Sequence, residues 1–230
     1  MDVHGVIMAG GKGARLRPLT YKLPKPLIEV NGKTLIAGVL DRMVDAGVPK
    51  ITIVVNYKGD MIQEAIGNEW KGVSIDYFHE TTPLGTAGAL PLIKTKHDTF
   101  FVSNADIITD QYIGDMIAYH IGVKADITVA IRKINHAIPY GVISTVDDKV
   151  YSILEKPVTS YEVNAGMYVI DAITLIRIPD NQYFDMTTLI NDLCMKRGNV
   201  RSFPINGVWR DIGRHEDLRE VENAFLQTET

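Results

Sequence analysis

A cluster of glycines and basic residues near the start of the sequence has the composition of a phosphate-binding segment. Residues 6–26 read VIMAGGKGARLRPLTYKLPKP and contain five basic side chains and no acidic one. The apolar run Val3–Met8 predicts a strand that leads into Gly10, Gly11 and Gly13. Because glycine has no Cβ atom, backbone N–H groups at these positions can approach an anion closely. We therefore expect a phosphorylated ligand at this segment.

Two familiar glycine-rich phosphate loops do not fit these residues. The dinucleotide fingerprint G-x-G-x-x-G requires a third glycine where this chain has Leu16, and a Walker loop requires Ser or Thr where Gly13 follows Lys12. A solvated basic loop is the simple alternative, but it needs neither clustered glycines nor the prolines that follow. Arg15 and Lys25 are therefore expected to place fixed positive charge beside a bound phosphate.

The run G-G-x-G-x-R-L-x-P-L-T…P-K-P resembles the opening of the sugar-1-phosphate nucleotidylyltransferases, and is most similar to the mannose- or heptose-1-phosphate guanylyltransferase type without a C-terminal β-helix. These enzymes make a nucleotide sugar and pyrophosphate from an NTP and a sugar 1-phosphate. One departure is Ala14, because the family most often has Thr or Ser there and a hydroxyl contact to phosphate is lost. The resemblance implies catalytic roles for Arg15 and Lys25, and nucleotide binding by Ala9, Gly10, Gly11 and Gly13.

Length and composition fit one nucleotidyltransferase domain over residues 1–230. Apolar residues make up 46% of the chain, and the net charge is −4. The acidic balance argues against a nucleic-acid partner and favours a small anionic ligand at the basic cluster. Cys194 is the single cysteine, so no internal disulfide can form, and we expect it in the core. The sequence lacks a charged leader and a long apolar run, so we expect no membrane partner and a cytoplasmic location.

Alternating strand and helix patterns in the first half predict a Rossmann-like three-layer α/β sandwich with a mostly parallel central sheet. In such sheets ligands bind beyond the carboxyl ends of the strands. After Val3–Met8, strands are expected at Ile51–Val55, Val73–Phe78 and Phe100–Ser103, and helices from the Thr34 cap to Gly47, near Met61–Ile66 and over about Thr86–Ile93.

The second half predicts the same sandwich with an added β-hairpin region for sugar binding. The hairpin is expected over Gly141–Leu154 with its turn at Asp147-Asp148. The other elements expected here are a helix near Asp110–Ile121, strands at Ile127–Arg132, Gly166–Ile170 and before Pro204, a helix over Thr187–Lys196 ended by Gly198, and a helix from about His215 to Leu226.

Two aspartates follow predicted strands and are candidate ligands for Mg²⁺. Asp106 comes just after an apolar strand, and Asp211 holds the same position relative to a later one. A helix cap or turn is the alternative role for Asp106, and an ion pair with Arg210 is the alternative for Asp211. Mg²⁺ takes oxygen ligands and usually uses one or two carboxylates together with substrate phosphates. Both positions match the metal-binding aspartates of the resembled family, although Ala105 replaces its more frequent glycine.

A second glycine segment, Leu84–Gly88, reads L-G-T-A-G and by itself predicts only a loop that enters a helix. In the resembled family the matching loop contacts the nucleobase, so the resemblance implies that Gly85 and Thr86 bind the nucleotide. The form of the loop favours guanine without excluding a uridylyl- or thymidylyltransferase.

The segment Glu155-Lys156-Pro157 at the end of the hairpin reads by itself as an exposed charged turn. A residue before proline is expected to be extended, which would let the Lys156 side chain project from the sheet edge. The resemblance instead implies that Lys156 holds the sugar phosphate and that Glu155 contacts a sugar hydroxyl. It also implies sugar contacts from Tyr140, Gly141, Asn164 and Gly166.

The predicted activity is the Mg²⁺-dependent transfer of a nucleoside monophosphate from an NTP to a sugar 1-phosphate. A sugar 1-phosphate is already largely dianionic at neutral pH, so the reaction needs no general base. Two rivals are a catalytically silent nucleotide-sugar-binding subunit and a nicotinamide-dependent reductase, and the failed dinucleotide fingerprint disfavours the second. The sugar and the oligomeric state are left open, with a homo-oligomer possible.

Overall fold

The computed structural model describes the backbone of residues 2–226 and the side chains of residues 2–222. An eight-stranded sheet forms its centre, in the order β13-β9-β12-β7-β1-β4-β6-β5. All neighbouring strands in this sheet are parallel except the pairs that include β12 or β5, so the sheet is mostly parallel as predicted. Its strands are β1 (Val3–Met8), β4 (Lys50–Val55), β5 (Glu69–Trp70), β6 (Val73–His79), β7 (Thr99–Asn104), β9 (Ile127–Ala137), β12 (Val158–Asp171) and β13 (Val200–Pro204).

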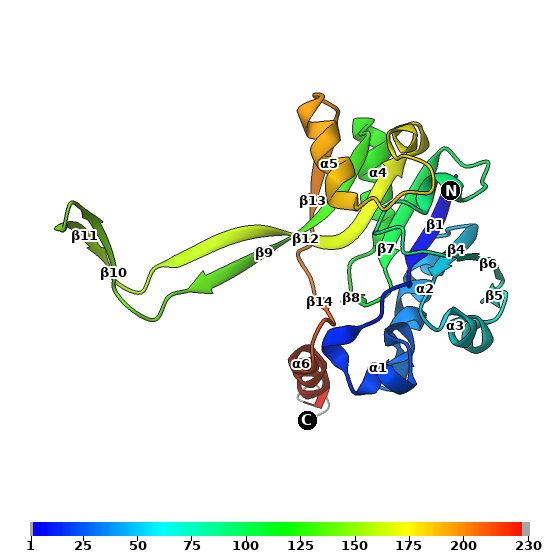
Figure 1. Cartoon of the computed structure of the whole chain (residues 1–230), viewed down its shortest axis with the longest axis horizontal. Coiled ribbons are helices and arrows are strands. Elements are labelled where there is room, and N and C mark those ends of the chain that lie inside the picture. The colour runs from blue at the N-terminus through cyan, green and yellow to red at the C-terminus, as the bar shows by residue number, and fades with distance from the viewer. Residues whose placement is uncertain (1, 227–230) are drawn as a thin grey trace.

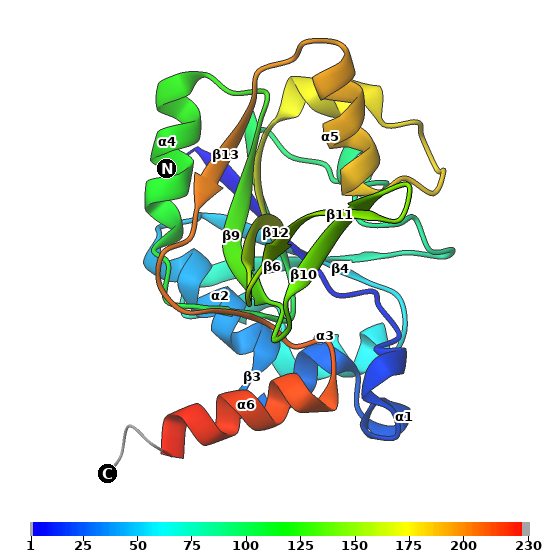
Figure 2. The ribbon, with the colours of Figure 1, turned by 90° about the vertical axis from the view of Figure 1, so that its left-hand side faces the viewer.

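Helices cover both faces of the sheet and complete the predicted three layers (Figures 1 and 2). Alternate residues of β1 belong to opposite faces, so that Ile7 packs into one apolar cluster and Val6 into the other. The first cluster lies against α2 (Leu35–Asp45), α3 (Gly59–Ile66) and α4 (Ile113–Val123), and the second against the 3₁₀-helices η3 (Leu90–Leu92) and η4 (Ala172–Arg177) and α5 (Met186–Met195).

Several further elements lie at the end of the sheet where β1 finishes (Figure 1). They are the 3₁₀-helices η1 (Ala14–Leu16) and η2 (Lys25–Leu27), α1 (Leu19–Lys22), α6 (His215–Leu226), and the strand pairs β2 (Glu29–Val30) with β3 (Lys33–Thr34) and β8 (Ile107–Thr109) with β14 (Trp209–Asp211). No helix in residues 2–226 is long and apolar enough to cross a membrane.

Local sequence signals account for several element ends. The Thr34 hydroxyl accepts a hydrogen bond from the N–H of Ala37 at 3.3 Å and so caps α2, and Gly47 follows the helix with φ +72°, both as predicted. The hairpin of β10 (Val142–Val146) and β11 (Lys149–Leu154) turns at Asp147-Asp148, where φ is 46° and 63°. Two positive φ values in a two-residue loop match the right-handed twist of the flanking strands.

Two expectations about the fold are wrong. Residues 86–93 form turns and η3 rather than a helix, because the N–H groups of Ala87 and Gly88 bond to the carbonyl of Phe184 instead of closing helical turns. Cys194 is exposed, because the buried face of α5 is the one that carries Leu189 and Leu193.

The end of α5 also differs from the expectation. Arg197 takes the left-handed conformation with φ 57°, while the N–H of Gly198 bonds back to the carbonyl of Leu193 at 2.8 Å. The predicted helix over 187–196 is thus present within one residue at each end, and only the left-handed position differs, because Arg197 rather than Gly198 occupies it.

An arm projects from the sheet. The outer halves of β9 and β12 continue beyond the body as a two-stranded ribbon, and β10 and β11 form a separate hairpin at its end (Figure 1). We call residues 131–164 the arm, residues 131–137 paired with 158–164 its stem, and residues 142–154 its tip hairpin. No residue of the arm is buried.

Candidate active site

A pocket of 450 Å³ opens at the carboxyl ends of β1 and β7. The chain runs from β1 to β4 and β6 on one side and then places β7 on the other side of β1, so the strand order reverses at this point. Crevices at such reversals are the usual ligand sites of open α/β sheets. The pocket is lined by residues 8–11, Gly13, Ala14, Arg15, Lys25, Pro26, Glu80, Pro83, Gly85, Thr86, residues 104–106, Tyr183, Asp185 and Gly213.

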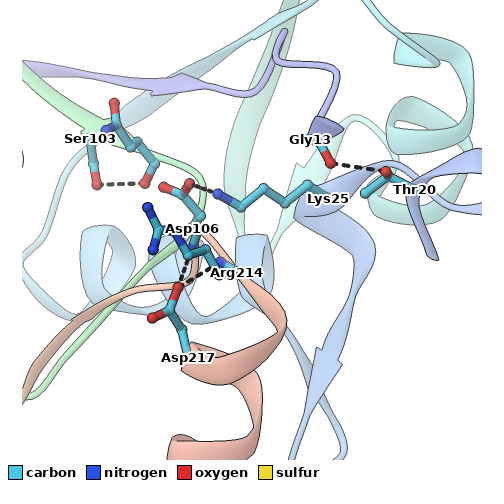
Figure 3. Close-up of polar contacts among 9 residues, drawn as sticks. Gly13, Thr20, Lys25, Ser103, Asp106, Arg214 and Asp217 are labelled. Carbon is cyan, nitrogen blue, oxygen red and sulfur yellow. Dashed lines mark hydrogen bonds and ion pairs between the residues drawn. The ribbon is translucent and has the colours of Figure 1, made fainter. Parts of the chain in front are cut away.

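The glycine loop that follows β1 forms one wall of the pocket. A Cβ at Gly10 would lie 2.9 Å from the Glu80 carboxylate, and Gly13 has φ +58° with Thr20 packed against it. The Thr20 hydroxyl donates to the Gly13 carbonyl at 2.9 Å and so fixes the loop (Figure 3). Within residues 2–226, the N–H groups of Gly10, Gly11 and Gly13 make no hydrogen bond. They are therefore free to bind an anion.

Two cations and two aspartates meet beside this loop. The Lys25 ammonium pairs with the Asp106 carboxylate across the pocket (Figure 3). The pKa of the Asp211 carboxyl group is raised. Burial is the largest cause, and the negative charge of nearby Asp106 is the next. The positive charges of Lys25 and Arg15 oppose that shift. The structure therefore brings these four predicted residues together.

Strand pairing across a long stretch of chain places Asp211. Strand β14 runs antiparallel to β8 with Asp211 opposite Ile107, and the N–H of Ile212 bonds to the carbonyl of Asp106 at 3.2 Å. The Asp217 carboxylate then accepts hydrogen bonds from the N–H groups of Gly213 and Arg214 at 2.8 and 2.6 Å (Figure 3). The alternative partner for Asp211 is engaged elsewhere, because Arg210 faces Glu220.

The two aspartates fit a magnesium ion. Oδ1 of Asp106 is buried and has no hydrogen-bond partner among the described residues, although buried carboxylate oxygens are normally satisfied. No cluster of three or more candidate ligands occurs in the described residues. Two carboxylates with room for phosphate oxygens suit Mg²⁺ better than metals that need a full protein cage.

The second glycine loop also lines the pocket through Gly85 and Thr86. Gly85 has φ +79°, and a Cβ there would lie 2.6 Å from the carbonyl oxygen of Phe184. The Thr86 hydroxyl donates to the Asp185 carboxylate at 3.2 Å and accepts the N–H of Met186 at 2.8 Å. The Thr86 side chain thus ties this loop to the start of α5.

Sequence reasoning missed two carboxylates of the pocket, Glu80 and Asp185. Glu80 accepts the N–H of Leu84 at 3.3 Å, and burial raises the pKa of its carboxyl group. Its position directly after β6 is a sequence signal for a residue of the site, because ligands bind beyond the carboxyl ends of such strands. Asp185 precedes α5 directly and reads in sequence only as a helix cap, so its contact with Thr86, which lies ninety-nine positions earlier, has no local signal.

Four of the predicted sugar-binding residues lie on the arm rather than at the pocket. Tyr140 and Gly141 precede β10, and Glu155 and Lys156 follow β11, so all four meet where the stem joins the tip hairpin. A Cβ at Gly141 would lie 3.0 Å from the Glu155 carboxylate, which shows that the two segments touch. None of the four lines the pocket of its own chain.

The backbone at Lys156 differs from its expected conformation. Lys156 is left-handed with φ 44° rather than extended, because the chain must turn there from β11 into β12.

Asn164 and Gly166 lie at the root of the arm. The Asn164 amide donates to the Tyr168 hydroxyl at 2.8 Å, and its carbonyl oxygen accepts the N–H of Gly166 at 3.0 Å. Gly166 has φ +73°, and a Cβ there would lie 2.8 Å from the side chain of Asn104, which lines the pocket. Gly166 is therefore close to the pocket, while the Asn164 side chain is engaged within the sheet.

Comparison with known proteins identifies the family. Residues 4–228 match the family described as nucleotidyl transferase. The chain is 35% identical over 236 residues to a mannose-1-phosphate guanyltransferase of Yarrowia lipolytica, covering 98% of this chain and 65% of that protein. It is 34% identical over 243 residues to a mannose-1-phosphate guanyltransferase of Gibberella zeae, with 99% and 65% covered. The chain thus spans just under two thirds of the length of these relatives.

A solved structure agrees with the fold. HddC from Yersinia pseudotuberculosis is 25% identical, with a TM-score of 0.75 over 96% of this chain and 99% of that chain. The same protein complexed with GMP-PN gives a TM-score of 0.72. The sequence match over nearly all residues confirms what the glycine-rich segment predicts: this chain belongs to the nucleotidyl transferase family.

Proposed function

We propose that this protein transfers a nucleoside monophosphate from an NTP to a sugar 1-phosphate and releases pyrophosphate. One observation carries the proposal: the glycine loop, Arg15, Lys25 and Asp106 line one pocket at the carboxyl ends of the strands, and Asp211 lies near Asp106, Lys25 and Arg15. The names of the relatives, which are guanyltransferases of mannose 1-phosphate, support the same chemistry.

The reaction is a displacement at the α-phosphorus of the NTP. An oxygen of the sugar phosphate forms a bond to that phosphorus while the bond to the bridging oxygen of the β-phosphate breaks, and the electron pair leaves with pyrophosphate. The sugar phosphate is a dianion at neutral pH and attacks without a general base. Holding two anions in line and stabilising the developing charge then supply the rate enhancement.

Residues of the pocket divide these tasks. The free N–H groups of Gly10, Gly11 and Gly13 bind phosphate oxygens. Arg15 and Lys25 add positive charge at the pocket, and the carboxylates of Asp106 and Asp211 would hold Mg²⁺. An ion held there would supply positive charge to offset the negative charge of the phosphates.

We propose guanine as the base and a mannose-type hexose 1-phosphate as the first sugar to test. The names of the guanyltransferase relatives and the complex of HddC with GMP-PN support this choice. Gly85 and Thr86 are proposed to contact the nucleotide, since both line the same pocket as the glycine loop. A uridylyl- or thymidylyltransferase activity is the alternative within the same class, as are aminohexose and heptose 1-phosphates. We place the enzyme in the cytoplasm, because a lone cysteine needs no oxidising compartment.

Pyrophosphate release with Mg²⁺, four NTPs and a panel of hexose, aminohexose and heptose 1-phosphates tests the proposal. We expect release with GTP and one sugar phosphate. Asp106→Asn should abolish release while the protein stays folded, because the substitution removes a charge from the proposed metal site. Asp192→Asn is the matched control, since Asp192 forms ion pairs with Arg177 and Lys196 on the surface of α5. Full activity of Asp106→Asn would refute the metal role, and NTP binding without release by any pair would favour a silent binding subunit.

A further inference from the structure

The arm exposes an unusually apolar surface. Among its large side chains, Tyr140, Tyr151 and Tyr161 are 73%, 66% and 57% exposed. Aromatic side chains bury about 150–250 Å² each, so these three leave roughly 300–500 Å² uncovered. The largest contiguous apolar patch on a typical monomer is about 300–600 Å², and larger ones mark interaction sites. The exposed aliphatic residues of the arm are Ile134, Val142, Ile143, Val146, Val150, Ile153, Leu154 and Val158.

The tip hairpin is apolar on both faces. Ile143 pairs with Ile153 and Val142 pairs with Leu154, and neighbouring pairs of a ribbon point to opposite sides. The two strands join no other sheet, so their outer edges are unpaired. An isolated two-stranded hairpin is at best marginally stable in water. The tip hairpin therefore requires a covering surface.

The root of the arm directs it away from the pocket of its own chain. A register shift between Asn164 and Tyr168 bends β12 at the root, and the two hydrogen bonds of the Asn164 side chain hold that bend. Beyond it, seven consecutive residue pairs, from Asn164 with Ile131 to Val158 with Ala137, continue the ribbon without a break. At about 3.3 Å per residue the stem carries the tip hairpin roughly 20 Å outward.

The pocket of the same chain is short of positive charge for two phosphorylated substrates. Its lining carries the cations Arg15 and Lys25 against the carboxylates Glu80, Asp106 and Asp185, and Lys25 already pairs with Asp106. The triphosphate and the sugar phosphate each add negative charge. Lys156 follows Glu155 on the arm and is not among the residues that line the pocket of its own chain.

We propose that a second copy of this chain covers the arm, and that each arm lies over the pocket of the other copy and supplies Lys156 to it. This inference rests on the proposed function for the role of Lys156. A stable interface buries roughly 800 Å² per partner, and the exposed apolar side chains of the stem and the tip hairpin are the surface that we assign to it. The exchange is reciprocal, as expected for a two-fold dimer.

The oligomeric state tests the covering surface without any assay of activity. Light scattering of the wild-type protein should give the mass of a dimer, and Ile153→Glu should give a monomer because it places a charge on the tip hairpin. The matched control is Ile176→Glu, since Ile176 is 84% exposed on η4 and stays outside the proposed interface. Circular dichroism of each variant verifies that the body is folded. A monomeric wild-type protein overturns the inference.

Mixing two inactive variants tests the supply of Lys156 between copies. Asp106→Asn disables a pocket and Lys156→Ala disables an arm, so each homodimer should lack activity. In a mixed dimer the intact arm of the Asp106→Asn copy reaches the intact pocket of the Lys156→Ala copy. Equimolar mixing with subunit exchange should therefore restore about one quarter of wild-type pyrophosphate release.

The outcomes separate this inference from the proposed function. No recovery in mixed dimers, verified by tagging each copy, means that the arm serves its own chain, as does full activity of a monomer. Full activity of Lys156→Ala also overturns the inference. A wild-type dimer that releases no pyrophosphate with any substrate pair refutes the proposed function and the role given to Lys156, while the light-scattering comparison still decides the interface.

Discussion

His4 makes the stability of the fold depend on pH in a defined window. Its ring is fully buried in β1, where Nε2 lies 2.8 Å from the Thr52 hydroxyl and Nδ1 has no partner among the described residues. The pKa of His4 is lowered from 6.5 to about 4, chiefly by burial and in smaller part by the neighbouring His97 and Lys50, while Asp76 acts in the opposite direction. The folded protein therefore keeps this imidazole neutral.

The sign and size of the effect follow from proton linkage. Between the folded pKa of about 4 and the unfolded value of 6.5, the unfolded chain binds a proton that the folded chain does not. Stability is therefore unaffected by His4 above pH 6.5 and is lost as the pH falls toward 4. The full shift corresponds to about 3 kcal/mol, of which about 2 kcal/mol is lost between pH 7 and pH 5.

Urea unfolding of the wild-type protein and His4→Gln at several pH values measures this contribution. Glutamine can reach the Thr52 hydroxyl but does not titrate, so the variant should lose about 2 kcal/mol less than the wild type between pH 7 and pH 5. His136→Gln, which changes an exposed imidazole on the arm, should follow the wild-type curve. Parallel curves for wild type and His4→Gln would refute the reasoning. If His4→Gln does not fold, an NMR titration of the His4 ring in the wild type decides the same point, since titration near pH 6.5 contradicts it.

Substitutions of Gly85 and Thr86 test the second glycine loop. Gly85→Ala should cost at least about 2 kcal/mol in urea unfolding, because φ is +79° and the new Cβ would lie 2.6 Å from the Phe184 carbonyl. Gly72→Ala has the same kind of φ at +84° with open space around it, and should cost about 1 kcal/mol. Equal losses of stability in Gly72→Ala and Gly85→Ala would show that the contact with the Phe184 carbonyl adds nothing. Thr86→Val should lower stability by about 1–3 kcal/mol in thermal unfolding, because the N–H of Met186 loses its acceptor. Thr86→Ser keeps that acceptor and should stay within about 1 kcal/mol of wild type, so equal losses in the two variants would count against the hydrogen bond.

Sequence patterns predict the parts of this fold that depend on neighbouring residues. The glycine loop follows a continuous apolar strand, α2 begins at a capping threonine, and the tip hairpin turns at two aspartates that tolerate positive φ. Each of these signals lies within a few residues of the structure that it determines. The mostly parallel sheet follows from the alternation of such segments.

Other features depend on contacts between distant segments and carry no local signal. Asp211 reaches Asp106 through the pairing of β14 with β8, which no periodicity predicts. Residues 86–93 have a helix-like composition, but the carbonyl of Phe184 takes the N–H groups of Ala87 and Gly88. The direction of the arm depends on the register shift in β12, which is invisible in a run of residues that reads simply as a strand.

The pairing of β14 with β8 also sets when the pocket can be completed during synthesis. The glycine loop and Asp106 lie in the first half of the chain, whereas Asp211 joins them from a strand made more than one hundred residues after β7 begins. A ribosome that has translated only the first half carries a chain with the phosphate-binding loop and one carboxylate. Contacts of such long sequence separation form late in folding. A nascent chain therefore cannot assemble both aspartates before β14 has left the ribosome.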